Sequence, residues 1–176
     1  MISHKHKFVL ITPPRTASNT IRKDLENVLG EHLGNHKSIE EYLLKFPDLS
    51  DYKFYGSVRD PWSRLLSYWC FFLKQDISFK QFITNQRNID KLYVDILDLF
   101  SIDNTLIVLK YINFNNLQKD FDAFCKDVGI LPFKLSIDNK GSGGNCSLEI
   151  NNYYSEELYD IVKKEYKKEI EHFRYD

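Results

Sequence analysis

Two short stretches of the sequence combine arginine with hydroxyl side chains. In the first, Arg15 is followed by the hydroxyl residues Thr16, Ser18 and Thr20. An apolar run at 8–11 and two prolines precede this stretch, and an apolar pattern at helical spacing follows it. A strand, a tight loop and a helix aim free backbone N–H groups and a helix N-terminus at an anion. The stretch therefore predicts a loop that holds a phosphate or a sulfate.

A structural alternative for this loop stays open. The prolines could end an edge strand, and Ser18 or Asn19 could simply cap the helix, as such residues often do. Neither GxxxxGK[ST] nor GxGxxG occurs in the chain, so the two common nucleotide-loop patterns do not decide the question.

The second stretch runs from Arg59 to Ser67 and follows an apolar strand predicted over 53–58. Arg59 comes at the carboxyl end of that strand, where open α/β sheets bind their ligands. Arg64 and Ser67 are three apart on the next helix, so they are neighbours on its surface. Two arginines and a serine suit a phosphate monoester. The alternative is a strand–helix junction whose arginines pair with surface carboxylates.

Two further residues are candidates with open alternatives. His36 lies in a polar loop ahead of a short helix that begins with a capping box at Ser38, and it could equally be a surface residue. Lys140 lies in the segment 138–145, which holds three glycines. That segment could be a plain surface loop, or a lid whose lysine reaches a bound phosphate.

The spacing of apolar residues predicts the elements that would position these groups. We expect a helix that closes at Gly30, a third strand over 105–109, a helix over 117–128 and a last helix that opens at Ser155. Strands and helices alternate, which predicts an α/β layer fold with a mainly parallel central sheet flanked by helices. The length of 176 residues predicts a single domain over 1–176.

Composition limits the classes of function. A hydrophobic content of 43% fits a packed globule, and a net charge of −1 argues against nucleic-acid binding through a global positive field. The three cysteines (Cys70, Cys125 and Cys146) lack metal spacing, which indicates reduced thiols. We see neither a signal-peptide pattern nor an apolar run of membrane-spanning length, so we expect a soluble, cytoplasmic protein without a membrane span.

In this order and at these junctions, the two motifs resemble those of the sulfotransferases that use 3′-phosphoadenosine 5′-phosphosulfate (PAPS). The carbohydrate branch, with the heparan and chondroitin O-sulfotransferases and their bacterial relatives, is the most similar. The family's first loop, P-K-T-G/A-G-T-S, reads PRTASNT at 14–20 here. Its second motif, V-R-[DN]-P-W-x-R-x-x-S, is present in full at 58–67.

The loop departs from the family pattern in two ways. Arg15 replaces the usual lysine, and ASN at 17–19 replaces the glycine-rich centre, which leaves fewer positions that adopt positive φ easily.

The resemblance implies a three-layer, P-loop-like fold and a transferase that moves a sulfuryl group from PAPS to an acceptor hydroxyl, with a saccharide as the family-level expectation. The loop would bind the 5′-phosphosulfate, Arg59 and Ser67 the 3′-phosphate, and His36 would take the acceptor proton. Arg15 would stabilise the leaving 5′-phosphate, and no metal is needed. The predicted donor-binding residues are Arg15, Thr16, Ala17, Ser18, Asn19, Thr20, Arg59, Ser67 and Lys140.

Two other functions remain open. A P-loop-like small-molecule kinase is disfavoured by the missing Walker lysine and serine and by the 3′-phosphate motif. A catalytically inactive nucleotide-binding module is the other alternative, because the first loop is altered.

Overall fold

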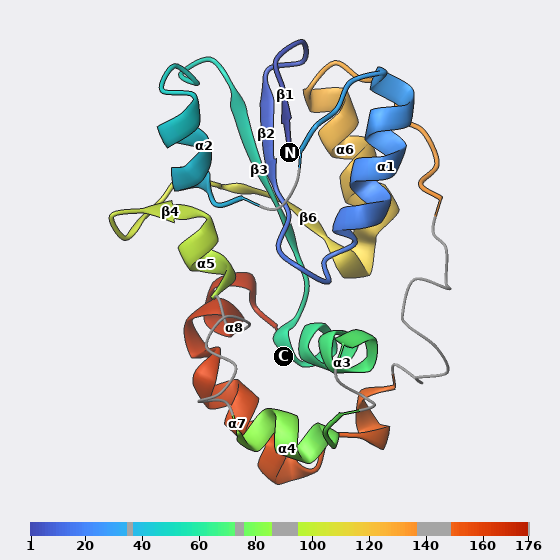
Figure 1. Ribbon diagram of the computed structural model, residues 1–176, viewed down its shortest axis with the longest axis vertical. Helices are drawn as coiled ribbons and strands as arrows, with labels where there is room; N and C mark the ends of the chain where they lie inside the picture. Colours follow the sequence, from blue (N-terminus) through green and yellow to red (C-terminus); the bar gives the residue numbers. More distant parts are fainter. Residues whose placement is uncertain (35–36, 73–75, 86–94, 137–148, 176) are drawn as a thin grey trace. The chain divides into compact units, whose positions relative to one another are not determined.

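The computed structural model describes residues 1–34, 37–72, 76–85, 95–136 and 149–175 (Figure 1). The chain divides into two compact units, the first made of Met1–Val58 and Ile96–Ile137 and the second of Arg59–Asp95 and Asp138–Asp176. The expectation of one domain over 1–176 stays a prediction, because two compact units can belong to a single domain.

A four-stranded, mostly parallel sheet forms the centre of the first unit (Figure 1). The strand order is β1-β2-β3-β6. β2, β3 and β6 run parallel, and β1 pairs antiparallel with β2 at the edge. The bounds are Ile2–Ser3 for β1, Phe8–Ile11 for β2, Lys53–Val58 for β3 and Lys110–Asn113 for β6. The prediction of a mixed α/β fold with a mainly parallel sheet is confirmed at this level.

Helices flank this sheet. α1 (Ser18–Leu29) and α6 (Leu117–Asp127) lie on one side of it, and α2 (Ile39–Lys45) lies on the other (Figure 1). The unit also contains a short helix α5 (Ile96–Leu99) and a 3-10 turn η2 (Phe114–Asn116). Its core joins fully buried side chains of β2, α1 and α6, among them Phe8, Leu10, Ile21, Leu25 and Phe121.

The helix boundaries in this unit follow the chemistry of their terminal residues. Gly30 ends α1 with φ 65°, and its N–H donates to Glu26 O at 2.9 Å, as expected for a left-handed C-cap. Ser38 opens α2 with a capping box, in which Ser38 Oγ accepts from the Glu41 N–H and the Glu41 carboxylate accepts from the Ser38 N–H. Both predicted boundaries are confirmed.

The prediction of a third strand over 105–109 is wrong. Residues 105–106 form β5 (Thr105–Leu106), which pairs antiparallel with β4 (Ser101–Ile102) in a separate hairpin. Asp103 and Asn104 adopt positive φ of 47° and 62°, as a tight two-residue hairpin turn requires, and this turn pairs the first two residues of the apolar run with β4. The third parallel strand is β6, a few residues later.

Gly56 allows a close aromatic contact on one face of the sheet. A Cβ atom built at Gly56 would lie 2.4 Å from Cζ of Phe100, well inside van der Waals contact. The Phe100 ring also stacks on Tyr111 of β6, with ring centroids 5.8 Å apart. Glycine therefore lets Phe100 cover β3 directly.

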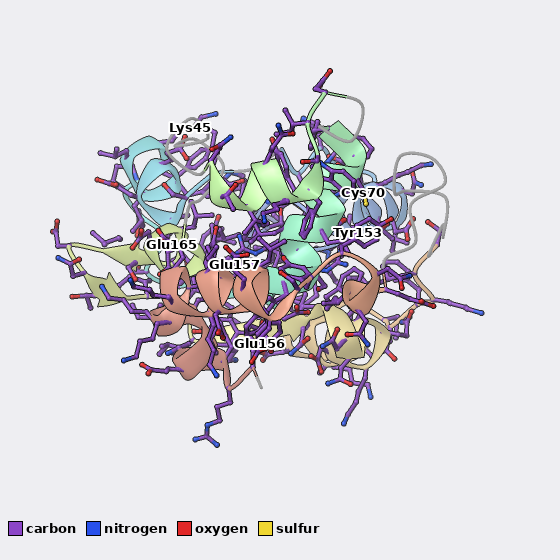
Figure 2. The ribbon with its side chains drawn as sticks, turned by 90° about the horizontal axis from the view of Figure 1, so that it is seen from below. Lys45, Cys70, Tyr153, Glu156, Glu157 and Glu165 are labelled. Carbon is purple, nitrogen blue, oxygen red and sulfur yellow. The ribbon has the colours of Figure 1, made fainter. Side chains whose placement is uncertain are left out.

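The second unit is helical in its described part. It contains α3 (Pro61–Phe72), α4 (Phe79–Thr84), the 3-10 turn η3 (Ile150–Asn152), α7 (Glu156–Glu165) and α8 (Lys167–Phe173). Ser155 caps α7 as predicted, because its side chain accepts from the Leu158 N–H. Glu156 and Glu157 lie in the first turn of α7, and Glu165 is its last residue (Figure 2). The predicted last helix is therefore two helices.

The cysteines differ in state. Cys125 is a free, buried thiol in α6, and burial raises its pKa to about 12. The prediction of a reduced thiol is confirmed at this position. Cys70 of α3 is disulfide-bonded, so the prediction of reduced thiols is wrong at this position. Cys146 lies outside the described residues. Within the described ranges, no helix is long and apolar enough to cross a membrane.

Candidate anion-binding site

The loop after β2 turns through two left-handed residues that are not glycine. Arg15 has φ 67°, and Ala17 has φ 65° and ψ 18°. A left-handed residue with a Cβ costs about 1–2 kcal/mol, so the surrounding structure must hold this conformation. Successive N–H groups around such turns form concave anion sites. The loop thus has two residues at positive φ, although it contains no glycine.

α1 begins one residue earlier than a Ser18 cap would require and two residues earlier than an Asn19 cap would require. Its N-cap is Ala17, whose methyl side chain accepts no hydrogen bond, and Ser18 is the first helical residue. The alternative in which Ser18 or Asn19 caps the helix is therefore wrong. Ala17 is among the poorest N-caps and leaves the first-turn N–H groups without a cap side chain. Ser18 is buried, Thr20 is half-buried and Asn19 is exposed.

The Thr16 hydroxyl is engaged inside the protein. Thr16 is completely buried, and its Oγ1 donates to Pro13 O at 2.7 Å. Oγ1 also lies 2.5 Å from Oγ of Ser57, a buried residue near the end of β3. This side chain holds the loop together, so the hydroxyl is not placed as a donor to a ligand. A ligand role for Thr16 would rest on its backbone N–H.

In the second unit, Arg59 and Ser67 are both buried, with exposed fractions of 5% and 1%. Arg59 Nε donates to Ser63 Oγ at 2.9 Å, and the Ser63 N–H donates to Asp60 Oδ1 at 2.8 Å. Asp60 thus caps α3, which begins at Pro61. Arg59 and Ser67 make further interactions, so an incoming phosphate would have to share or replace existing partners.

Arg64 has a different role from the one expected of it. Its Nη2 lies 2.7 Å and 3.0 Å from the two carboxylate oxygens of Glu169 in α8. The guanidinium also lies over the Tyr166 ring, 5.3 Å from the centroid. Arg64 therefore pairs with a carboxylate, as the structural alternative predicted, but the pair is buried within the second unit and does not lie on the surface.

His36 and Lys140, the proposed proton acceptor and the proposed lid lysine, lie outside the described residues. Their assignments stay predictions.

Sequence reasoning missed three residues that organise these stretches: Ser57, Ser63 and Glu169. Ser57 had a detectable signal, since it is a polar residue inside an otherwise apolar strand end. Ser63 also had a signal, because it lies four residues after Arg59 in the first turn of α3. Glu169 had no local signal, because its partner Arg64 is 105 positions away in the sequence.

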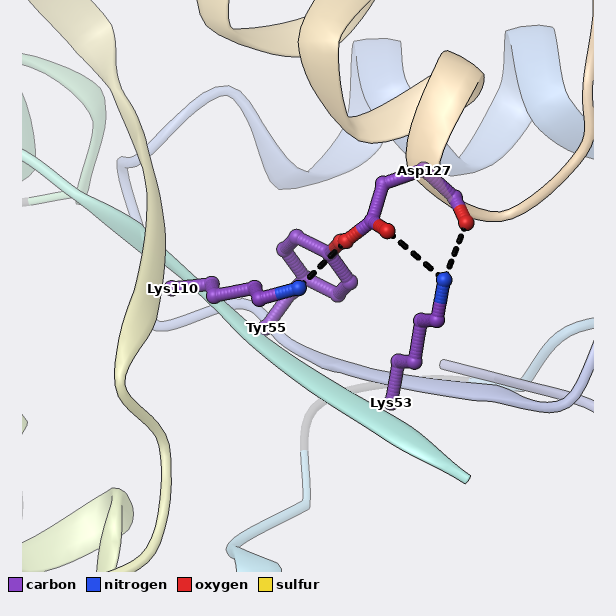
Figure 3. Close-up of polar contacts among 4 residues, drawn as sticks. All are labelled: Lys53, Tyr55, Lys110 and Asp127. Carbon is purple, nitrogen blue, oxygen red and sulfur yellow. Dashed lines mark hydrogen bonds and ion pairs between the residues drawn. The ribbon is translucent and has the colours of Figure 1, made fainter. Parts of the chain in front are cut away.

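A polar cluster of the first unit lies at the other end of the parallel strands from the loop after β2 (Figure 3). Lys53 and Lys110 are the first residues of β3 and β6, and both donate to the Asp127 carboxylate, at 2.6 Å and 2.5 Å. Tyr55 OH donates to the same carboxylate. These contacts hold the pKa of Asp127 well below its usual range. The cluster ties α6 to the sheet, because two lysines of the strands share the one carboxylate of Asp127.

The described residues contain no group of three His, Cys, Asp or Glu side chains placed to hold a metal ion. The sequence matches no protein-family model, no curated protein and no solved structure.

Proposed function

We propose that this protein is a PAPS-dependent sulfotransferase that transfers a sulfuryl group to an acceptor hydroxyl, with a saccharide as the acceptor class. The observation that carries the proposal is the backbone of the loop between β2 and α1. Two non-glycine residues, Arg15 and Ala17, are held at positive φ, and they deliver a helix start whose N-cap has no capping side chain. Strained backbone of this kind gathers at ligand sites.

The location of the loop agrees with this proposal. The loop follows the carboxyl end of β2, which runs parallel to its neighbour β3 in the same unit. Ligands of open parallel sheets bind outside the carboxyl ends of the strands. A three-layer, P-loop-like architecture is the fold that we propose with this function.

Each motif is assigned one end of the donor. The loop 14–20 would take the 5′-phosphosulfate with its N–H groups, and Arg15 would add a permanent charge. Arg59 and Ser67 would bind the 3′-phosphate, which distinguishes PAPS from ATP-like donors, and Lys140 would add a further contact. Ala17 contributes through its backbone, because its side chain has no polar atom.

The reaction would be an in-line displacement. The acceptor oxygen forms a bond to sulfur, and the bond from sulfur to the 5′-phosphate oxygen breaks with its electron pair on that oxygen. His36 would receive the acceptor proton, and Arg15 with the loop N–H groups would stabilise the charge that develops on the leaving 3′-phosphoadenosine 5′-phosphate. Positioning and charge stabilisation supply most of the catalysis in the analogous phosphoryl transfers.

Turnover tests this proposal directly. The protein is incubated with radiolabelled PAPS and pools of saccharides, lipids and small phenols, and label transfer is measured with and without Mg²⁺. The proposal predicts transfer to the saccharide pool without a requirement for Mg²⁺. Binding of the donor without transfer to any pool would instead support the inactive module, and Mg²⁺-dependent phosphoryl transfer from ATP would support a kinase.

A further inference from the structure

We infer that Ser57 is a positioning residue that holds the anion-binding loop in its strained conformation through the side chain of Thr16. The inference deepens the proposed function, and it rests on that function only for what the loop binds. Ser57 lies on β3, outside both sequence motifs, and it belongs to the same compact unit as the loop.

Ser57, Thr16 and Pro13 form a chain of hydrogen bonds, here called the relay, and the number of hydroxyl protons fixes its direction. A hydroxyl has one proton to donate and two lone pairs that accept. Thr16 donates its proton to Pro13 O at 2.7 Å, so the 2.5 Å contact between Thr16 Oγ1 and Ser57 Oγ is a donation by Ser57. The relay therefore runs from Ser57 to Thr16 and from Thr16 to Pro13.

The relay fixes the residue between the two strained positions. Thr16 is flanked by Arg15 and Ala17, both at positive φ. Non-glycine residues stay in this conformation only where the surrounding structure over-determines it. The Thr16 side chain spans the bend, because it bonds the carbonyl of Pro13 on one side and β3 on the other. Release of Thr16 would let the loop relax toward negative φ.

The anchor is excluded from solvent. Ser57 and Thr16 are both completely buried. A buried hydroxyl that loses its partner is not rescued by solvent, so removal of either member has a full desolvation cost. Ser57 pairs with Ile112 in the ladder between β3 and β6, within the centre of the sheet. The hydrogen bond to Ser57 thus fixes the position of the loop relative to the sheet.

Backbone amide hydrogen exchange of the ligand-free protein tests the positioning role. In Ser57→Ala, the amides of residues 15–20 should exchange about threefold to tenfold faster than in the wild type, the effect of one lost buried hydrogen bond on local opening. Ser3→Ala is the matched control. Ser3 is also a completely buried, hydrogen-bonded serine of the same sheet, but it lies on the edge strand β1. Exchange at 15–20 should not change in this control.

Thr16 variants provide a second test if Ser57→Ala folds poorly. Thr16→Val removes the hydroxyl but keeps the shape, and it should accelerate exchange at 17–20. Thr16→Ser keeps the hydroxyl and should restore near wild-type exchange. Affinity for 3′-phosphoadenosine 5′-phosphate should fall threefold to tenfold in Ser57→Ala and Thr16→Val, but not in Thr16→Ser or Ser3→Ala.

The outcomes separate this inference from the proposed function. Unchanged exchange at 15–20 in Ser57→Ala, or equal exchange in Thr16→Val and Thr16→Ser, would overturn the positioning role whatever the protein binds. Faster exchange in a protein whose wild type binds no 3′-phosphoadenosine 5′-phosphate would support the positioning role and contradict the proposed function.

Discussion

Arg64 and Glu169 form a buried ion pair between α3 and α8, with Arg64 Nη2 2.7 Å from Glu169 Oε2. The side chains are 7% and 0% exposed, so neither charge is compensated by water. The pair links the helix that carries the second sequence motif to the C-terminal helix of the same unit. Its removal should therefore change stability much more than a surface pair would.

Glu169→Gln should destabilise the protein by about 3–5 kcal/mol, because it leaves the Arg64 charge buried without a counter-charge. Urea unfolding measures this loss. Glu171→Gln is the matched control in α8, since the Glu171–Lys167 pair is exposed and should contribute about 0–1 kcal/mol. The double variant Arg64→Met/Glu169→Leu should recover most of the stability. Equal losses in Glu169→Gln and Glu171→Gln would refute the importance of the buried pair.

Gly56→Ala should cost about 1–3 kcal/mol, because the new methyl would overlap the Phe100 ring. The same denaturation experiment measures it. In a Phe100→Leu background the smaller side chain makes room, so the alanine should cost clearly less there. A full-size penalty in both backgrounds would mean that the backbone, and not the ring, rejects the alanine.

Stability should fall on acidification as the Asp127 carboxylate is protonated and loses its charge. Hydrogen bonds from Lys110, Lys53 and Tyr55 lower the folded-state pKa of Asp127, so its contribution is complete above the unfolded pKa near ~4 and is lost as pH falls through the folded pKa. Asp127→Asn should flatten the stability profile below about pH 4. Urea unfolding midpoints, measured from pH 2 to pH 7 in steps of about one pH unit, give the stability profiles of both proteins. Parallel profiles for Asp127→Asn and wild type would contradict the assignment.

The sequence predicted helix boundaries well, because contacts between residues close in the sequence determine them. Ser38, Gly30 and Ser155 end or begin helices through contacts with residues three or four positions away, and such contacts are visible in a short window. The third strand was misplaced because the turn at Asp103 and Asn104 pairs residues 105–106 with β4 in a separate hairpin, and an apolar run alone does not show which strand it pairs with.

The positions of the loop and of the strand–helix junction were predictable, but the contacts of their side chains were not. The arginine and hydroxyl residues marked the loop and the strand–helix junction. The sequence could not show that Thr16 turns inward to Ser57, or that Arg64 turns toward Glu169, because both partners are brought close only by tertiary folding. Positive φ at Arg15 and Ala17 was also unexpected, since neither residue type favours it.

His36→Ala should slow sulfuryl transfer by about 10²–10⁴-fold and leave donor affinity unchanged, if His36 is the general base. The acidic limb of the wild-type rate profile should report a group titrating near ~6.5 and should disappear in the variant. His32→Ala is the control, because His32 is a mostly exposed neighbour whose Nδ1 contacts Glu26. A variant that keeps the wild-type rate and the acidic limb would place the base elsewhere, with Glu40 or Glu41 as the next candidates.

We propose that the protein recognises a nucleotide by its 3′-phosphate, and thermal unfolding with two nucleotides tests this recognition. At a hundred times its dissociation constant, 3′-phosphoadenosine 5′-phosphate should stabilise the fold by about 2.7 kcal/mol and raise Tm, with or without Mg²⁺. ADP, which lacks the 3′-phosphate, should raise Tm far less, and Arg59→Ala should remove most of the difference between the two. Equal shifts with both nucleotides, or a shift with neither, would contradict the account.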